Sequence, residues 1–217
     1  MPEGDLAATL TTLFNAHRAA RIAHDKLTDP DPALVVPVLE RAYLEATKLD
    51  DDDEALLRFD VIAEVLGELS GARAVDLLID ILGREEPEAR HAAGEALSEI
   101  AFERFKEVAL GVERAIERLK PGNPALAELP YLLAEISEPG VSKLLGRFLA
   151  HSDADAVASA IEAVVEAGDP ANAPLLEPLL SDARRVQLQD DGGTESDASL
   201  GELAAEARAL LEGKARP

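Results

Sequence analysis

The chain has 217 residues without a single cysteine, and its 43 acidic side chains against 21 basic ones give a formal net charge of −22 at pH 7. These numbers exclude disulfide scaffolds, thiolate metal sites and catalytic thiols, and they disfavour binding to nucleic acid or anionic lipid. No apolar run approaches the ~20 residues that a membrane span needs, so we expect a cytoplasmic protein without nucleic-acid or membrane partners.

Residues 1–28 are predicted to form one long amphipathic helix. Its apolar residues recur at helical spacing, as Leu6, Leu10, Leu13, Phe14 and Ala20 show. The segment lacks the basic, apolar pattern of a secretory signal. A helix at this position would cap the open end of a repeat array, which such arrays need for solubility.

Residues 29–213 repeat a unit of two helices. Five segments align on a shared glutamate at intervals of 31, 36, 31 and 46 residues: Glu68, Glu99, Glu135, Glu166 and Glu212. Helix-turn-helix units of about 30 to 45 residues have this period. The first helices of the units are predicted at 33–48, 72–82, 107–119, 140–149 and 171–180. The second helices are predicted at 54–69, 88–100, 125–136, 155–167 and 200–211, and no strand is expected.

Pairs of a polar residue and proline mark the predicted helix starts. The polar side chain can cap exposed backbone N–H groups, and proline fits the first helical position. These pairs are Asp29-Pro30, Asp31-Pro32, Glu86-Pro87, Asn123-Pro124, Glu138-Pro139 and Asp169-Pro170.

The excess length of the last interval is local to residues 187–199, QLQDDGGTESDAS. This segment is polar, contains glycine and has no periodicity, so it is predicted to be an inserted acidic loop. It is either a mobile surface loop or a loop that contacts a partner, because insertions in repeat arrays often lie on the binding side. Residues 214–217 are predicted to form a tail.

One segment carries a family resemblance. Glu88-Ala-Arg-His-Ala-Ala-Gly-Glu-Ala-Leu-Ser-Glu-Ile100, following Glu86-Pro87, resembles the second helix of short prokaryotic HEAT repeats of the phycobilisome-lyase-like type. The resemblance covers about residues 33–213. It implies an all-α, armadillo-like fold, a right-handed α-solenoid of about five HEAT-like helix hairpins behind an N-terminal capping helix. It also implies a binding scaffold with a concave docking surface.

Metal-binding and catalytic patterns are absent from the sequence. HEAT-like di-iron hydroxylases use repeated His-Glu dipeptides on their second helices, and none of the four histidines here precedes a glutamate. The acidic run 50–54 lacks the glycine that a calcium loop needs at its sixth position. We therefore expect no metal, no cofactor and no catalytic residue, and predict that the chain is not an enzyme.

A candidate partner-binding surface follows from the helical register. Equivalent positions on stacked second helices lie about 8–10 Å apart and form a ladder beside the apolar stripe. The predicted partner-binding residues on this ladder are Asp60, Glu64, His91, Glu95, Tyr131 and Glu162. Tyr131 is either an interface residue or packs beside Pro130, and the sequence leaves both open.

The sequence thus favours a non-enzymatic scaffold for protein–protein interaction, whose acidic concave face holds a basic protein partner. One alternative is an immunity or inhibitor protein that neutralises a basic toxin. Another is an accessory subunit similar to phycobilin lyase-type HEAT proteins. The acidity can also reflect genome composition or salt adaptation, and the oligomeric state is not predicted.

Overall fold

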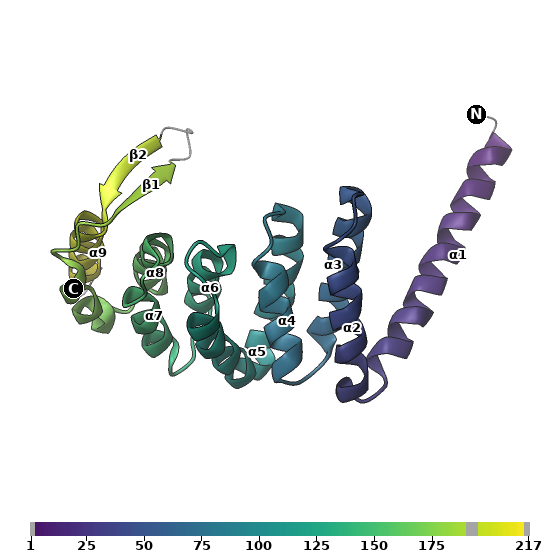
Figure 1. Ribbon diagram of the computed structural model, residues 1–217, viewed down its shortest axis with the longest axis horizontal. Coiled ribbons are helices and arrows are strands. Elements are labelled where there is room, and N and C mark those ends of the chain that lie inside the picture. Colours follow the sequence, from purple (N-terminus) through teal and green to yellow (C-terminus); the bar gives the residue numbers. More distant parts are fainter. Residues whose placement is uncertain (1–2, 190–194, 215–217) are drawn as a thin grey trace.

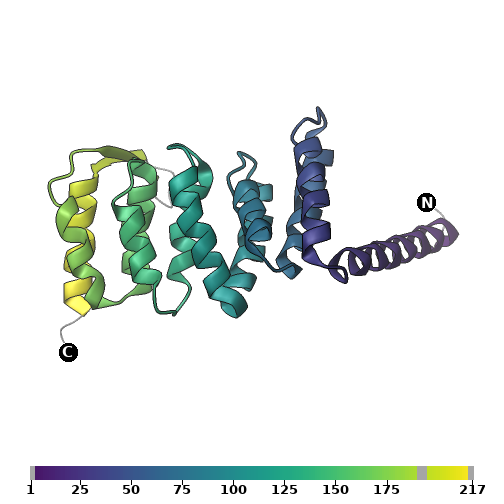
Figure 2. The same cartoon turned by 60° about the horizontal axis from the view of Figure 1, so that its bottom comes forward.

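The computed structural model describes residues 3–189 and 195–214, and within these ranges the chain is helical almost throughout. Figure 1 shows the helices side by side in a bent row, and Figure 2 shows the same row from a second direction. The prediction of an all-α solenoid is confirmed. Its right-handed sense and its count of about five repeats stay predictions. Most of the predicted tail at 214–217 lies outside the described residues.

The helices of the predicted units fall into two layers, behind the N-terminal helix α1 (Glu3–Thr28). The first-helix layer consists of α2 (Pro32–Ala46), α4 (Ala72–Leu82), the C-terminal half of α5 (Pro87–Arg118), α7 (Val141–Leu149) and the 3-10 helix η1 (Pro170–Leu179). The second-helix layer consists of α3 (Asp52–Glu68), the N-terminal half of α5, α6 (Pro124–Ala134), α8 (Ala154–Ala167) and α9 (Leu200–Lys214).

Capping side chains explain where several helices begin. Asp31 accepts a hydrogen bond from the backbone N–H of Ala33 at 2.9 Å, and Asn123 accepts one from Ala125 at 3.0 Å. Proline occupies the first or second position of α2, α5 and α6, where its missing N–H costs nothing. The polar–proline pairs therefore act as helix starts at these places.

Two predicted helices are joined in the structure. Helix α5 covers the predicted helix 88–100 and all but the last residue of the predicted helix 107–119. Between its ends, its backbone leaves the helical region only at Arg104, with φ −136° and ψ 44°. The Arg104 guanidinium donates to the carbonyl of Leu69 at 3.1 Å and to that of Gly67 at 3.2 Å. The bend in α5 thus places a cation on the last carbonyls of α3, which satisfies groups that a helix end leaves unpaired.

The hydrophobic core lies between the two layers and runs along the row. Among its fully buried side chains are Phe59 of α3, Leu97 of α5 and Phe148 of α7. Burial of each such side chain contributes about 1.5–3 kcal/mol relative to leaving it exposed. The fold is therefore stabilised by contacts between neighbouring units rather than by one central cluster.

A β-hairpin replaces most of the predicted loop, so the expectation of no strand was wrong. Strands β1 (Arg185–Gln189) and β2 (Glu195–Ser199) pair antiparallel, with Val186 opposite Ala198. Val186 is buried, and Arg185 donates to Asp197 at 2.7 Å. The alternation of apolar and polar residues in this segment is too weak to predict strands. The hairpin is held instead by the burial of Val186 and by the contact of Arg185 with Asp197. Residues 190–194 of the predicted loop lie outside the described residues.

The predicted helix at 171–180 is a 3-10 helix, and its prolines give the reason. Pro174 and Pro178 lie inside η1 and have no backbone N–H to donate to the preceding turn. An α-helix would need these two N–H groups for its i to i−4 hydrogen bonds, so the α-helical pattern is interrupted here.

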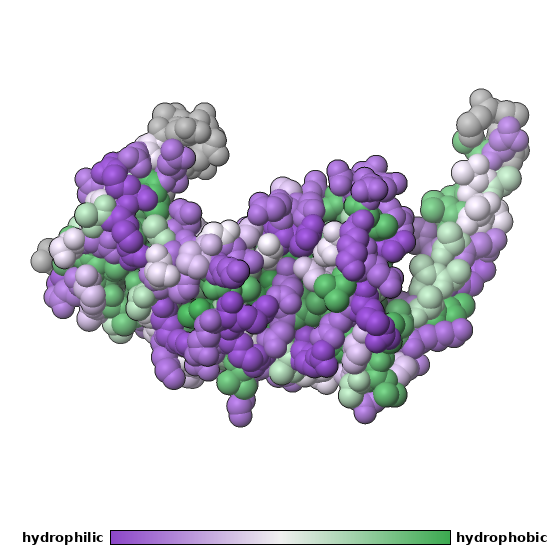
Figure 3. Space-filling model, in the orientation of Figure 1, coloured by the Kyte–Doolittle hydropathy of each residue, from purple (hydrophilic) through white to green (hydrophobic). Residues whose placement is uncertain are grey.

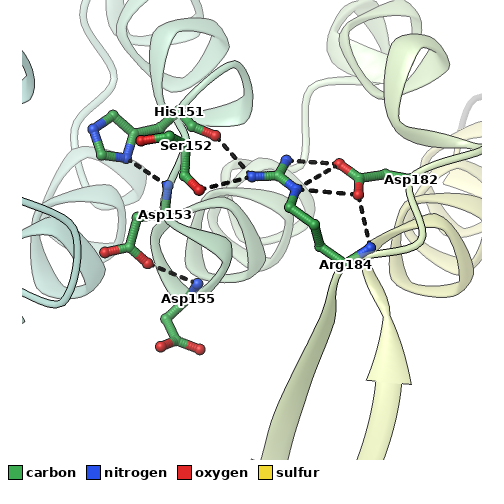
Figure 4. Close-up of polar contacts among 6 residues, drawn as sticks. All are labelled: His151, Ser152, Asp153, Asp155, Asp182 and Arg184. Atoms are coloured by element: carbon green, nitrogen blue, oxygen red, sulfur yellow. Dashed lines mark hydrogen bonds and ion pairs between the residues drawn. The ribbon is translucent and has the colours of Figure 1, made fainter.

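Polar side chains tie the last unit to the turn before α8 (Figure 4). Arg184 pairs with Asp182 at 2.6 Å and donates to the backbone carbonyls of His151 at 3.0 Å and Ser152 at 3.1 Å. The buried Asp153 caps α8 and also accepts from the N–H of Gly122 at 2.6 Å. These bonds fix the relative position of three successive turns.

None of the helices in the described part of the chain is both long enough and apolar enough to cross a bilayer.

Candidate functional site: the acidic face of the second-helix layer

The structure brings the six predicted partner-binding residues to one face. Asp60 and Glu64 lie on α3, and His91 and Glu95 lie on the N-terminal half of α5. Tyr131 follows on α6 and Glu162 on α8, and all six side chains are exposed. We call this surface the acidic face. That it is the concave side of the array stays a prediction.

A wide groove separates α3 from α5 on the acidic face. It has a volume of about 1160 Å³, and its charged lining consists of Arg104 and six carboxylates: Asp60, Glu64, Glu68, Glu95, Glu99 and Glu103. Small residues lie between the two helices, since a Cβ added at Gly67 would come 3.4 Å from that of Ala96. Phe102 also lines this groove and is 72% exposed. The groove therefore combines dense negative charge with an apolar contact.

A second, smaller groove lies between α5 and α6. It has a volume of about 310 Å³ and is lined by residues that include His91, Glu95 and Tyr131. Arg90 approaches Glu128 across it, with Nε 3.3 Å from a carboxylate oxygen. Glu95 lines both grooves, so the two grooves adjoin at this residue.

Tyr131 connects two units of the acidic face. Its hydroxyl donates to the carboxylate of Glu162, which bridges α6 and α8. Burial, and then the neighbouring Glu162 carboxylate, raise the pKa of Tyr131 to about 12. The residue is still 37% exposed and lines the smaller groove. Tyr131 is thus held in place and accessible at the same time.

The basic side chains are distributed unevenly between the layers. Four arginines join successive helices of the first-helix layer through carboxylates: Arg73 with Glu40, Arg114 with Asp76, Arg118 with Asp80 and Arg147 with Glu117. Burial raises the pKa of Asp80, although Arg118 acts in the opposite direction. In the acidic face, by contrast, Asp60, Glu99 and Glu103 have no basic partner among the described residues. The negative charge therefore concentrates on the second-helix layer.

Sequence reasoning missed several residues of the wide groove. Glu68, Glu99, Glu103 and Phe102 line it, and none was predicted to bind a partner. The two shared glutamates, Glu68 and Glu99, could have been found by extending the ladder one turn along each helix. No sequence signal marks Phe102, whose exposure depends on the bend at Arg104.

The residues present do not match a hydroxylase metal site of the His-Glu type. No histidine precedes a glutamate in the sequence. Among the described residues, no group of three or more His, Cys, Asp or Glu side chains is placed to hold a metal ion. His24 lies 3.5 Å from Glu68, and His91 lies 3.5 Å from Glu95, but these pairs are separate.

Curated relatives of this chain are enzymes. It is 37% identical over 116 residues to deoxyhypusine hydroxylase of Homo sapiens, and 35% identical over 115 residues to that of Bos taurus. Each match covers 45% of this chain, and it covers 37% of the human and 38% of the bovine protein. The chain therefore matches little more than a third of these relatives, and no family model matches it.

Two crystal structures of engineered proteins also align with this chain. They share 18% and 19% of their residues with it, at TM-scores of 0.34 and 0.37. The alignments cover 91% and 90% of this chain, and 90% and 91% of those chains. At such TM-scores, the likeness contributes nothing to the argument.

The comparisons correct one prediction and are compatible with another. The expectation that the chain is not an enzyme is contradicted, because the proteins that it matches are named as a hydroxylase. Deoxyhypusine hydroxylases are HEAT-repeat proteins, which agrees with the resemblance of the second helices to HEAT repeats.

Proposed function

We propose that the acidic face binds a basic segment of a partner protein. The observation that carries this proposal is the separation of charge between the layers. Arginines neutralise carboxylates in the first-helix layer, whereas the lining of the wide groove has six carboxylates against one base, Arg104. A segment with lysines or arginines would replace the missing countercharges, and an apolar side chain beside them would contact Phe102.

The shape of the acidic face suits an extended segment. The two grooves share Glu95 and together cross α3, α5 and α6. Repeat arrays typically bind along such a row of helices because each unit adds a similar contact. Attraction between exposed charges is screened over about 10 Å at 0.1 M salt, so binding of this kind weakens as salt rises.

The relatives suggest one class of segment to use as a probe. Their name states that they act on deoxyhypusine, so a peptide that bears deoxyhypusine is a natural ligand to compare with a plain lysine-rich peptide. The proposal concerns binding, and no hydroxylation step is derived from the residues of this chain.

The test measures the affinity of a labelled lysine-rich peptide by fluorescence anisotropy. The groove variant Glu64→Gln, Glu95→Gln, Glu99→Gln removes three carboxylates. The control variant Asp50→Asn, Glu138→Gln, Glu206→Gln removes three exposed carboxylates outside the grooves. We expect about a tenfold loss of affinity in the groove variant and less than about a threefold loss in the control.

Two results would contradict the proposal. The groove variant and the control could bind the peptide equally well, which would place the contact elsewhere. Alternatively, affinity could stay constant between about 50 mM and about 500 mM salt, although paired exposed charges are screened in that range. A deoxyhypusine peptide that binds more tightly than the lysine peptide would identify the preferred segment within the same proposal.

A further inference from the structure

Helix α1 leaves the array and is exposed over most of its length. Every side chain from Asp5 to Ala23 is exposed, and Figure 1 shows α1 diverging from α3 as the two are followed toward their N-terminal ends. Figure 3 shows apolar surface along the same helix. In proteins, most of the stability of a helix comes from the packing of its apolar side rather than from helix propensity. The apolar side of α1 therefore needs a cover that the described part of the chain does not provide.

Three uncovered leucines of α1 lie in one stripe, with the exposed Phe14 at its edge and the exposed Ile22 on the opposite side. Leu6, Leu10 and Leu13 are about half exposed, and His17, Ala20 and His24 continue the same alternating spacing of four and three residues. Residues spaced in this way share one side of a helix, as in helices that pair with another helix. Leu27, the next position of the stripe, packs against the core. The stripe is thus covered at its C-terminal end and open elsewhere.

A matching stripe lies on α3. His24 of α1 approaches Glu68 at 3.5 Å and Glu64 at 3.9 Å, so these glutamates face α1. Counting back along α3 by three and four residues leads to Val61 and Leu57, which lie on the same side and are 44% and 58% exposed. We call the space between the exposed parts of α1 and α3 the opening. Uncovered apolar side chains therefore lie on both of its sides.

Helix α1 is neutral, whereas α3 is strongly acidic. Helix α1 has three acidic and three basic side chains, whereas α3 has six acidic side chains and only Arg58 as a base. The bases Arg18 and Arg21 lie in the exposed part of α1. Two copies of a chain with a net charge of −22 repel each other, but this repulsion is least where one copy presents α1.

We infer that a second copy of this chain covers both stripes: α1 of each copy packs into the opening between α1 and α3 of the other. Such an exchange is reciprocal, so it closes around a two-fold axis and gives a dimer. Leu10 and Leu13 of one copy then contact Leu57 and Val61 of its partner. The His24 contact with Glu64 and Glu68 remains at the base of each opening.

Sedimentation equilibrium measures the mass of the full chain in solution and so tests the inference. We expect the mass of two chains for the native protein. The variant Leu10→Glu, Leu13→Glu should have the mass of one chain, because two carboxylates then enter an apolar, acidic contact. Ile22→Glu is the control, since Ile22 is 48% exposed on the opposite side of α1, and this variant should stay dimeric. Circular dichroism establishes that each variant is folded.

The proposed packing of α1 of one copy against α3 of the other leads to a second, more specific test. The variant Leu57→Glu, Val61→Glu should also be monomeric. When it is mixed with the α1 variant, one intact α1 and one intact α3 can meet, so part of the dimer should return. A native chain that stays monomeric at about 100 µM, where contacts of Kd near 10 µM are formed, would overturn the inference. An α3 variant that remains dimeric would overturn it as well.

Discussion

At the scale of the residue, Tyr131 shows how one side chain serves two demands. Its hydroxyl bridges α6 to α8 through Glu162, and its ring lines the smaller groove. The sequence left packing and interface roles open for this position. The structure shows the hydroxyl bonded to Glu162 while 37% of the residue stays exposed, and an interface role remains a prediction.

Removal of the Tyr131 hydroxyl should change the alkaline stability of the protein. The pKa of this hydroxyl is about 12 in the fold, against 10.0 for an unperturbed tyrosine, so both states keep the proton below pH 10. Between pH 10 and 12 the unfolded state loses a proton that the folded state keeps, and the stabilisation falls. Tyr131→Phe should cost about 1 kcal/mol at neutral pH.

Urea unfolding of both proteins at neutral pH and between pH 10 and 12 measures this effect. The difference in unfolding free energy between native chain and variant should shrink as the pH rises through that window. A difference that stays constant would mean that Tyr131 does not bond Glu162 in solution.

The residues of the acidic face were predictable to different degrees. Asp60, Glu64, His91 and Glu95 follow from the register of a single helix, which sequence periodicity supplies. The wide groove, which Asp60, Glu64 and Glu95 line, depends on the distance between α3 and α5. That distance is set by small side chains such as Gly67 and Ala96 in contact, which no single-helix pattern contains.

At the scale of the element, one glycine controls how closely α5 approaches α4. A Cβ added at Gly111 would overlap Cγ1 of Val75, far inside the distance of a normal contact. Valine is branched at Cβ and has little freedom to move away. We therefore expect Gly111→Ala to destabilise the fold by about 1–3 kcal/mol, despite the better helix propensity of alanine.

Gly94 is the matched control in the same helix. A Cβ there would meet Cδ1 of Leu82 at 3.8 Å, an ordinary contact, so Gly94→Ala should gain up to about 1 kcal/mol. Chemical denaturation of both variants measures whether each substitution raises or lowers the free energy of unfolding. Equal shifts in the same direction would show that α4 and α5 are not so closely packed in solution.

The elements that the sequence missed share a physical cause. Helix boundaries with capping side chains, such as Asp31 and Asn123, are local and were predicted well. The hairpin, the continuous α5 and the 3-10 helix η1 depend on long-range partners or on missing donors. Arg104, for example, is held at the bend by carbonyls more than 30 residues earlier in the chain.

At the scale of the whole molecule, the arrangement of charge matters more than its sum. A net charge of −22 does not reveal that arginines such as Arg114 and Arg118 join the first-helix layer, while the acidic face concentrates carboxylates. The shared glutamates are also unevenly paired, since Glu68 has His24 nearby and Glu99 has no basic partner in the described part of the chain. Concentrated, unpaired charge lowers stability and favours a ligand of opposite sign.

This distribution predicts opposite effects of neutralising the two layers. The variant Glu64→Gln, Glu95→Gln, Glu99→Gln relieves repulsion worth a few tenths of a kcal/mol at each site, so the melting temperature should rise by about 2–4 °C. The variant Arg114→Gln, Arg118→Gln leaves Asp76 and Asp80 without these arginines and should lower it.

Thermal melts at low and at high salt test this prediction. They also separate negative charge that serves ligand binding from negative charge that reflects general salt adaptation. The gain in the groove variant should shrink above about 0.5 M salt, because exposed charges are then screened. The arginine variant should remain destabilised, since the Asp80 side chain is only 35% exposed and its pairing is screened less. If the groove carboxylates instead stabilised the fold, their removal would lower the melting temperature at every salt concentration. The acidic face would then be part of the framework of the array, and its charge would require no ligand.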